Sequence, residues 1–395
     1  MTKRLYYADS YLKEFSGTVL ERRRIEDSPA VILDQTAFYP DSGGQPCDTG
    51  MLNDATVSKV LEDESGAILH VLDREIPVGA AIGKIDWQRR FDHMQQHTGQ
   101  RILSQAFIAT ARAQTLSFHM GAELSTIDID LAQPSMGQME AAQALATQVV
   151  FQNRAVHILA TDRDSLNSLG IRKESHREGE IRVIDVEEFD RSACGGTHVR
   201  STGEIGIIFI SGFERYKGGT RVEFAAGGRG LTLLQKDHDL LRQLAQIYSA
   251  APEKLPELTE KLLQERATLS RENELLQERL LEGESQDLLR DAQRTGNRLI
   301  ICRTFSNRKL ENIKVLAQKL AATPGVVAIL GIADACQIVL ARSKDLTGNC
   351  GEAIKKAAAE LGGKGGGRPE LAQAGGFSPD SLDRWMRALE HYFQA

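Results

Sequence analysis

Two pairs of metal-binding side chains constrain the fold of this chain more than any other feature of the sequence. His93 and His97 are separated by three residues, and Cys194 and His198 repeat this spacing much later in the chain. Side chains four residues apart share one face of a helix, and Gly195–Gly196 gives the second pair a flexible loop that can present both side chains to one ion. Either pair alone is also typical of an ordinary helix face or loop. Together they offer three imidazoles and one thiolate, which suit tetrahedral Zn²⁺, so we expect the fold to join them around one zinc ion.

The composition is that of a soluble globular protein with several domains. The 395 residues are 41% hydrophobic and 26% charged, close to the average of globular chains. No apolar run is long enough to span a membrane, the start Met1–Tyr7 lacks the apolar core of a secretory signal, and five scattered cysteines form no disulfide framework. We therefore expect a cytoplasmic protein without a membrane partner. The net charge of −6 excludes a chain that binds nucleic acid over its whole surface, but it leaves local basic patches open.

Residues 1–87 are predicted to form a small β-barrel. The runs 17–20, 30–33 and 67–72 are short, apolar or alternating, and Gly, Pro, Asp and Ser separate them. Closely spaced short strands with such turns are typical of barrels.

Residues 88–229 are predicted to form an α/β domain that carries both metal-ligand pairs. Apolar residues at helical spacing follow Trp87, which predicts a helix with His93 and His97 in its first half. Around this helix we expect a second helix between Pro134 and Asn153, and strands near 115–120, 126–131, 155–160, 181–186, 205–211 and 220–225.

Residues 230–295 are predicted to form a helical, coiled-coil linker. Leucines recur every seven residues at Leu255, Leu262, Leu269 and Leu276, which is coiled-coil spacing. Prolines at 252 and 256 interrupt the stretch, so we expect a helical hairpin or two successive helices. A spacer that packs on itself and an element that forms a homodimer are both compatible with this pattern.

Residues 296–395 alternate strand and helix patterns and are predicted to form a small α/β domain. The whole chain is thus expected to be an α+β multidomain protein. Seven of the fifteen residues 362–376 are glycine, which suggests a backbone with many positive φ angles. A flexible linker is one interpretation of this segment. Because it lies inside a domain and carries Lys364 and Arg368, we favour a loop whose exposed amides and cations bind a nucleic-acid backbone.

A third motif lies in the predicted barrel. In Phe38–Pro46 (Phe-Tyr-Pro-Asp-Ser-Gly-Gly-Gln-Pro), a Gly-Gly turn precedes Gln45, and Thr36 lies two residues before the motif. Alone, it is a turn with a polar tip. Together with the two metal-ligand pairs, in this order, it resembles the editing module of alanyl-tRNA synthetase and the free-standing AlaX editing proteins. The segment 368–376 resembles the C-terminal domain of the same synthetase, so the resemblance covers essentially the whole chain.

The resemblance implies a zinc-dependent hydrolase that removes a wrong amino acid, chiefly serine and secondarily glycine, from mischarged tRNA(Ala). Gln45 and Thr36, carried over from the family's pattern, would order the water or the substrate. An aminoacyl ester is already activated, so a positioned water and stabilisation of the carbonyl oxygen suffice. Four protein ligands would fill the coordination shell of zinc, whereas catalytic zinc keeps one position free for water or substrate. The sequence alone does not decide between these two kinds of site. Few residues precede Phe38, so we expect no aminoacylation domain and editing in trans.

Parts of the sequence are also compatible with other functions. The main alternative is a non-enzymatic zinc protein that binds tRNA. A metalloprotease would need a glutamate where Met94 stands, and Asp92–Met94 only approximates a DHH phosphoesterase motif. Arg89 and Arg90 are candidates for binding the tRNA end, with a solvated helix start as the favoured alternative. His119 is a candidate for lining the pocket, although a strand histidine with satisfied hydrogen bonds is the simpler interpretation.

Overall fold

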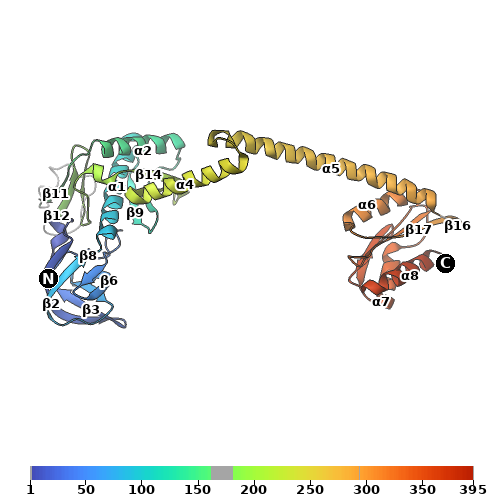
Figure 1. The fold of residues 1–395 in the computed structure, drawn as a ribbon, viewed down its shortest axis with the longest axis horizontal. Coiled ribbons are helices and arrows are strands. Elements are labelled where there is room, and N and C mark those ends of the chain that lie inside the picture. The colour runs from blue at the N-terminus through green and yellow to red at the C-terminus, as the bar shows by residue number, and fades with distance from the viewer. Residues whose placement is uncertain (1, 162–180, 293, 395) are drawn as a thin grey trace. The chain divides into compact units, whose positions relative to one another are not determined.

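The computed structural model describes residues 2–161, 181–292 and 294–394. The chain divides into two compact units, Met1–Pro252 and Glu253–Ala395, whose elements are drawn in Figure 1. The division falls inside the segment 230–295 that was predicted to be helical. Within the described residues, no helix combines the length and the apolarity needed to cross a membrane.

The first unit begins with the predicted barrel, which is confirmed. Six strands close it in the order β2-β3-β7-β6-β5-β8, and alternate side chains such as Val19, Leu33 and Val57 fill its interior. The N-terminal strand β1 (Lys3–Arg4) pairs with β4 (Gln35–Thr36) and so holds the N-terminal segment close to the barrel. The barrel strands are β2 (Glu14–Ile25), β3 (Ser28–Leu33), β5 (Gly50–Leu52), β6 (Ala55–Glu62), β7 (Ile68–Leu72) and β8 (Gly79–Ile85).

Helix α1 (Trp87–Ala111) forms the centre of the second half of this unit. Asp86 caps it by accepting a hydrogen bond from the Arg89 amide, and its apolar face packs on a four-stranded sheet in the order β14-β15-β10-β9. A three-stranded sheet, β11-β12-β13, carries the second metal-ligand pair beyond its last strand. The remaining elements are β9 (Thr115–Met120), β10 (Ser125–Ile129), α2 (Met136–Phe151), β11 (Val156–Thr161), β12 (Ile181–Val186), β13 (Asp190–Ala193), β14 (Ile208–Tyr216), β15 (Gly219–Ala226) and α4 (Gly227–Tyr248).

Arg90 joins α1 to the barrel. Its guanidinium is fully buried, forms an ion pair with Asp48 at 2.5 Å, and donates to the carbonyls of Ser10 and Ala37. Neither of the two roles considered from the sequence, tRNA binding or a solvated helix start, fits this position. Removing one partner of such a pair leaves a buried charge, which typically costs about 3–5 kcal/mol. Arg89 is half-buried and donates to the Cys47 carbonyl.

The second unit contains a long helix and a six-stranded sheet. The sheet has the order β16-β17-β18-β19-β21-β20. Along β18 (Val326–Ile332), alternate side chains pack toward α6 (Leu310–Ala321) and toward the side of α7 and α8, which explains its continuous apolar sequence. The other elements are α5 (Leu255–Asp291), β16 (Arg294–Thr295), β17 (Arg298–Phe305), β19 (Gln337–Arg342), α7 (Cys350–Leu361), β20 (Lys364–Gly367), β21 (Leu371–Gly375) and α8 (Leu382–Gln394).

The predicted linker segment contains two helices. Helix α4 ends at Tyr248 and α5 begins at Leu255, with a 3₁₀ turn at Pro252–Lys254 between them. On α5, the heptad leucines Leu262 and Leu269 are 53% and 64% exposed. Coiled-coil pairing and a homodimer therefore remain predictions.

The glycine-rich segment forms an edge strand, where the sequence predicted a loop with many positive φ angles. Residues Lys364–Gly367 make up β20 at one edge of the sheet. Positive φ angles occur at Gly362, Gly363 and Gly376, whereas Gly365 is needed for space, since a Cβ there would lie 2.6 Å from the Gln373 carbonyl oxygen. Lys364 and Arg368 are exposed. An edge strand still presents a row of backbone amides to a ligand.

Candidate metal centre

Three of the four predicted zinc ligands converge on one point. His97 lies on α1, and Cys194 and His198 lie on the loop that follows β13. The Cys194 sulfur is 3.4 Å from His97 Nε2 and 3.3 Å from His198 Nε2, and the three ligand atoms all lie within 4.8 Å of one another. Two imidazole nitrogens and a sulfur are a donor set that suits zinc, and a three-residue set leaves a position open for substrate or water.

His93 does not join this cluster. It lies one helical turn before His97, about 6 Å away along the axis for a rise of 1.5 Å per residue, and it borders a different cavity together with Trp87 and Arg229. The ring is buried and its Nδ1 has no hydrogen-bond partner. Burial, reinforced by the charges of Arg89 and Arg229, lowers the pKa of His93 to about 3. The cluster of ligand atoms that lie within 4.8 Å of one another does not include His93, so its place as a fourth ligand stays a prediction.

The two histidines of the cluster are held by a second layer of hydrogen bonds. Gln45 Oε1 lies 2.8 Å from His97 Nδ1 and also accepts from the Thr197 amide at 3.2 Å. An amide oxygen only accepts, so His97 Nδ1 donates to it, and His97 Nε2 is the nitrogen that faces the Cys194 sulfur. Thr98 plays the same part for His198, with its oxygen 3.1 Å from Nδ1. Such partners fix the tautomer and orientation of metal-binding imidazoles.

The charges in the cluster also suit a cation. Burial alone would raise the pKa of the Cys194 thiol, but the charge of Arg101 and the two imidazoles hold it well below its usual value. Burial lowers the pKa of His198 to about 3, so its imidazole is neutral. A thiolate and neutral imidazoles are the forms that coordinate metals.

Gly196 leaves no room for a side chain beside this cluster. A Cβ at this position would lie 2.3 Å from His97 Cε1 and 3.0 Å from Gln45 Oε1. We expect Gly196→Ala to displace the His97 ring and to lower zinc affinity by roughly tenfold, at the lower end of the effects of disturbed second-layer contacts. Zinc titration with a competing chelator measures this. Gly137→Ala, where a Cβ meets nothing within 4 Å, is the control, and equal affinities in the two variants would contradict the expectation.

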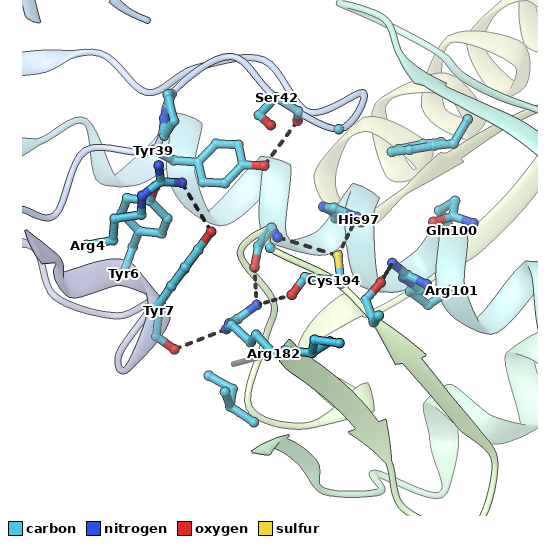
Figure 2. Close-up of a pocket in the computed structure, with 18 of the residues that line it drawn as sticks. Arg4, Tyr6, Tyr7, Tyr39, Ser42, His97, Gln100, Arg101, Arg182 and Cys194 are labelled. Carbon is cyan, nitrogen blue, oxygen red and sulfur yellow. Dashed lines mark hydrogen bonds between the residues drawn. The ribbon is translucent and has the colours of Figure 1, made fainter. Parts of the chain in front are cut away.

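The cluster opens into a cavity of about 750 Å³. The N-terminal segment, the Phe38–Pro46 loop, α1, β9 and β12 each contribute to its wall. Figure 2 shows His97 and Cys194 on one side of this space, with Arg182 and the Tyr6, Tyr7 and Tyr39 rings around it. Its volume lies within the range of small-molecule sites.

Other predicted site residues lie elsewhere. Thr36, on β4, is fully buried, and its hydroxyl is 2.8 Å from His70 Nε2 of the barrel strand β7 and accepts from the Phe38 amide. Its described hydrogen bonds are thus made to these two residues. His119 is an exposed residue of β9 and does not line the cavity. Lys364 and Arg368 belong to the second unit.

Two arginines in this site were missed by the sequence analysis. Arg101 is buried beside Cys194 and donates to Ser192 Oγ and the Ala193 carbonyl. It lies four residues after His97, so helical spacing alone could have placed it on the same face. Arg182 donates through Nη1 to the carbonyls of Cys194 and Gly196, at 2.9 and 2.7 Å, and no local pattern in the sequence announces this contact.

Three family models match separate parts of the chain. Residues 11–89 match the model described as tRNA synthetases class II (A), and residues 181–223 match the threonyl and alanyl tRNA synthetase second additional domain. Residues 297–395 match the DHHA1 domain. The second of these matches includes the loop with Cys194 and His198.

Two related proteins match this chain over nearly its whole length. The alanyl-tRNA editing protein AlaX-L of Pyrococcus horikoshii is 30% identical over 386 residues, which cover 94% of this chain and 94% of the relative. The alanine–tRNA ligase of Pyrococcus furiosus is 34% identical over 389 residues, but these cover only 42% of the ligase. The chain therefore spans less than half the length of that enzyme. Among solved structures, the C-Ala domain of Aquifex aeolicus alanyl-tRNA synthetase matches 27% of this chain at 26% identity and a TM-score of 0.25.

Proposed function

Because this chain belongs to the family of alanyl-tRNA editing proteins, we propose that it is an aminoacyl-tRNA deacylase that hydrolyses mischarged Ser-tRNA(Ala) in trans, with Gly-tRNA(Ala) as a second substrate. The observation that carries this proposal is the cluster of His97, Cys194 and His198, in which His97 and Cys194 line one cavity. The cavity is large enough for an aminoacyl group and part of the terminal ribose.

The proposed reaction is hydrolysis of an ester, and the residues present suit its needs. His97, Cys194 and His198 would hold Zn²⁺, which when bound supplies a Lewis acid next to the scissile carbonyl. Gln45 and Thr98 keep the two imidazoles oriented. Arg182 fixes the loop that carries Cys194 by binding two of its carbonyls. The protein thus supplies positioning, which an activated ester mainly requires.

Selection of serine over alanine would rest on polar groups in the cavity wall. Gln100, Thr115 and Ser117 line the cavity, and Gln100 and Thr115 both contact the Ser104 hydroxyl, at 2.7 Å each. Polar groups that bind a substrate hydroxyl are left unpaired by a substrate that lacks it, so the latter is strongly rejected.

Side-by-side turnover of Ser-tRNA(Ala), Gly-tRNA(Ala) and Ala-tRNA(Ala) tests the proposal. We expect release of serine to be fastest and release of alanine to be slowest. Equal rates for serine and alanine would contradict the proposed selectivity. Tight binding of all three without release of an amino acid would contradict the enzyme and favour a tRNA-binding protein.

We further propose that the second unit supplies affinity for tRNA through Lys364, Arg368 and the amides of β20. A chain that ends at Pro252 is expected to retain kcat on Ser-tRNA(Ala) and to show a clearly higher KM, because contacts to a nucleic-acid backbone position it without taking part in chemistry. Pro252 is chosen because the first compact unit ends there, whereas a cut near Gly230 would remove most of α4 from that unit.

Steady-state kinetics of both chains at two salt concentrations measure this effect. Added salt should narrow the difference in KM, because cationic contacts to phosphates weaken through counterion release. An unchanged KM after truncation would mean that β20 does not bind tRNA.

A further inference from the structure

The cavity beside the metal centre gathers hydrogen-bond donors that have no acceptor. Among the described residues, seven buried side-chain nitrogen or oxygen atoms lack a hydrogen-bond partner. Three of the seven, the Tyr6 hydroxyl, Arg101 Nε and Arg182 Nη2, belong to residues that line this one cavity. A buried donor without an acceptor is costly. A ligand rich in acceptor atoms would remove that cost.

The cavity wall also carries more positive than negative side chains, which likewise favours a ligand with acceptor atoms. Of the described lining residues, three are arginines and one, Glu62, is a carboxylate, and Glu62 pairs with Arg4 at 2.5 Å. Neither Arg101 nor Arg182 forms an ion pair with a carboxylate of the described residues. Arginine is charged at every physiological pH, so the wall carries an excess positive charge.

Arg182 is held in place before any ligand arrives. Nη1 donates to two loop carbonyls, and Nε donates to the Tyr7 carbonyl at 3.1 Å. The guanidinium also lies 5.6 Å from the Tyr7 ring centroid, and Figure 2 shows it between Tyr7 and Cys194. With three of its hydrogen bonds made, the group is ordered and keeps Nη2 for a further partner, and little entropy is lost when an anion binds.

We propose that Arg182 and Arg101 form an oxyanion-binding subsite next to the metal centre. This inference rests on the proposed function, whose chemistry offers two anions of the same kind. One is the phosphate on the 5′ oxygen of the terminal adenosine, which stays in place through hydrolysis. The other is the carboxylate of the released amino acid, which forms only when the ester is cleaved. Guanidinium groups bind both through charge-assisted hydrogen bonds.

Calorimetric titration of the full-length, zinc-loaded protein tests this with two matched pairs of probes. The difference in affinity between adenosine 5′-monophosphate and adenosine measures the contribution of the phosphate. The difference in affinity between L-serine and L-serinamide measures the contribution of the carboxylate. We expect the anionic member of at least one pair to bind about tenfold or more tightly, the range for one charge-assisted hydrogen bond. The pair that shows the preference identifies the source of the anion. Equal binding within both pairs would overturn the proposal.

Variants assign the preference to the arginines. Arg182→Met should abolish it and Arg182→Lys should retain part of it. The matched control is Arg191→Met, on the neighbouring strand β13, where the arginine pairs with Asp185 and does not line the cavity. Should Arg182→Met fail to fold, Arg101→Met provides the same comparison with the loop contacts of Arg182 intact. A preference that survives both methionine variants would overturn the subsite. These titrations need no turnover, so an inactive protein with an Arg182-dependent preference would refute the deacylase and leave the subsite standing.

Discussion

Replacement of Cys194 with alanine is expected to remove zinc from the protein and to lower deacylation of Ser-tRNA(Ala) by roughly two orders of magnitude or more, beyond what loss of a second-layer partner costs. The Cys194 sulfur lies within 3.4 Å of the Nε2 atoms of both His97 and His198. It is therefore the ligand atom that lies next to both of the other two. Without it, two imidazoles remain, and they bind zinc far more weakly than a set that includes a thiolate. Zinc content and single-turnover rates measure the two effects.

The matched control for Cys194→Ala is Cys302→Ala, which removes a half-buried thiol from strand β17 of the second unit. It should leave zinc content and rate unchanged. Removing zinc from the wild-type protein with a chelator should reproduce the loss of activity, and added zinc should restore it in the wild type alone. Normal zinc content in Cys194→Ala would refute the assignment of this ligand.

The regular elements were predictable because their signals are local. The helix after Trp87 shows apolar residues at helical spacing and a capping aspartate, and the barrel strands show alternation between turn residues. The Cys194–His198 loop was equally readable, since its glycines and ligands are adjacent in sequence. These features depend on a few neighbouring residues, so tertiary contacts do not override them.

The choice between His93 and His97 could not be made in the same way. Both are buried residues of α1, and helical spacing says only that they share a face. Which of them meets the Cys194 loop depends on how far along the helix that loop packs, a contact across about a hundred residues of sequence. The role of Arg182 could not be predicted from the sequence for the same reason, because it consists of contacts to Cys194, Gly196 and Tyr7.

The glycine-rich segment shows a different limit. Glycine is used both where φ is positive and where another backbone approaches closely, and composition does not separate the two uses. At Gly362 and Gly363 the first applies, with φ angles of 75° and 95°. At Gly365 and Gly367 the second applies, since a Cβ would lie 2.6 Å and 2.4 Å from atoms of strand β21. A segment that reads as a loop therefore forms a strand.

Gln45 provides the sharpest test of how the structure changes a prediction made from the sequence. As a residue that orders water or substrate, Gln45 would affect turnover and leave zinc binding alone. In the structure its side chain is fully buried and its Oε1 accepts from His97 Nδ1 and the Thr197 amide. We therefore expect Gln45→Ala to lower zinc affinity by roughly ten- to a hundredfold, the usual effect of losing the partner of a ligating histidine.

The turnover of Gln45→Ala should fall as well, by roughly one to three orders of magnitude, the range for lost positioning groups, and excess zinc should recover part of it. Gln45→Glu keeps an acceptor for His97 and should retain more zinc affinity than the alanine variant. Gln35→Ala, which removes a glutamine of strand β4 that donates to the Ser16 carbonyl, is the control and should change neither quantity. The two roles of Gln45 separate cleanly in these data, because only a residue that orients His97 links the loss of turnover to the loss of zinc. A slow Gln45→Ala enzyme with wild-type zinc affinity would instead place the amide at the water or the substrate.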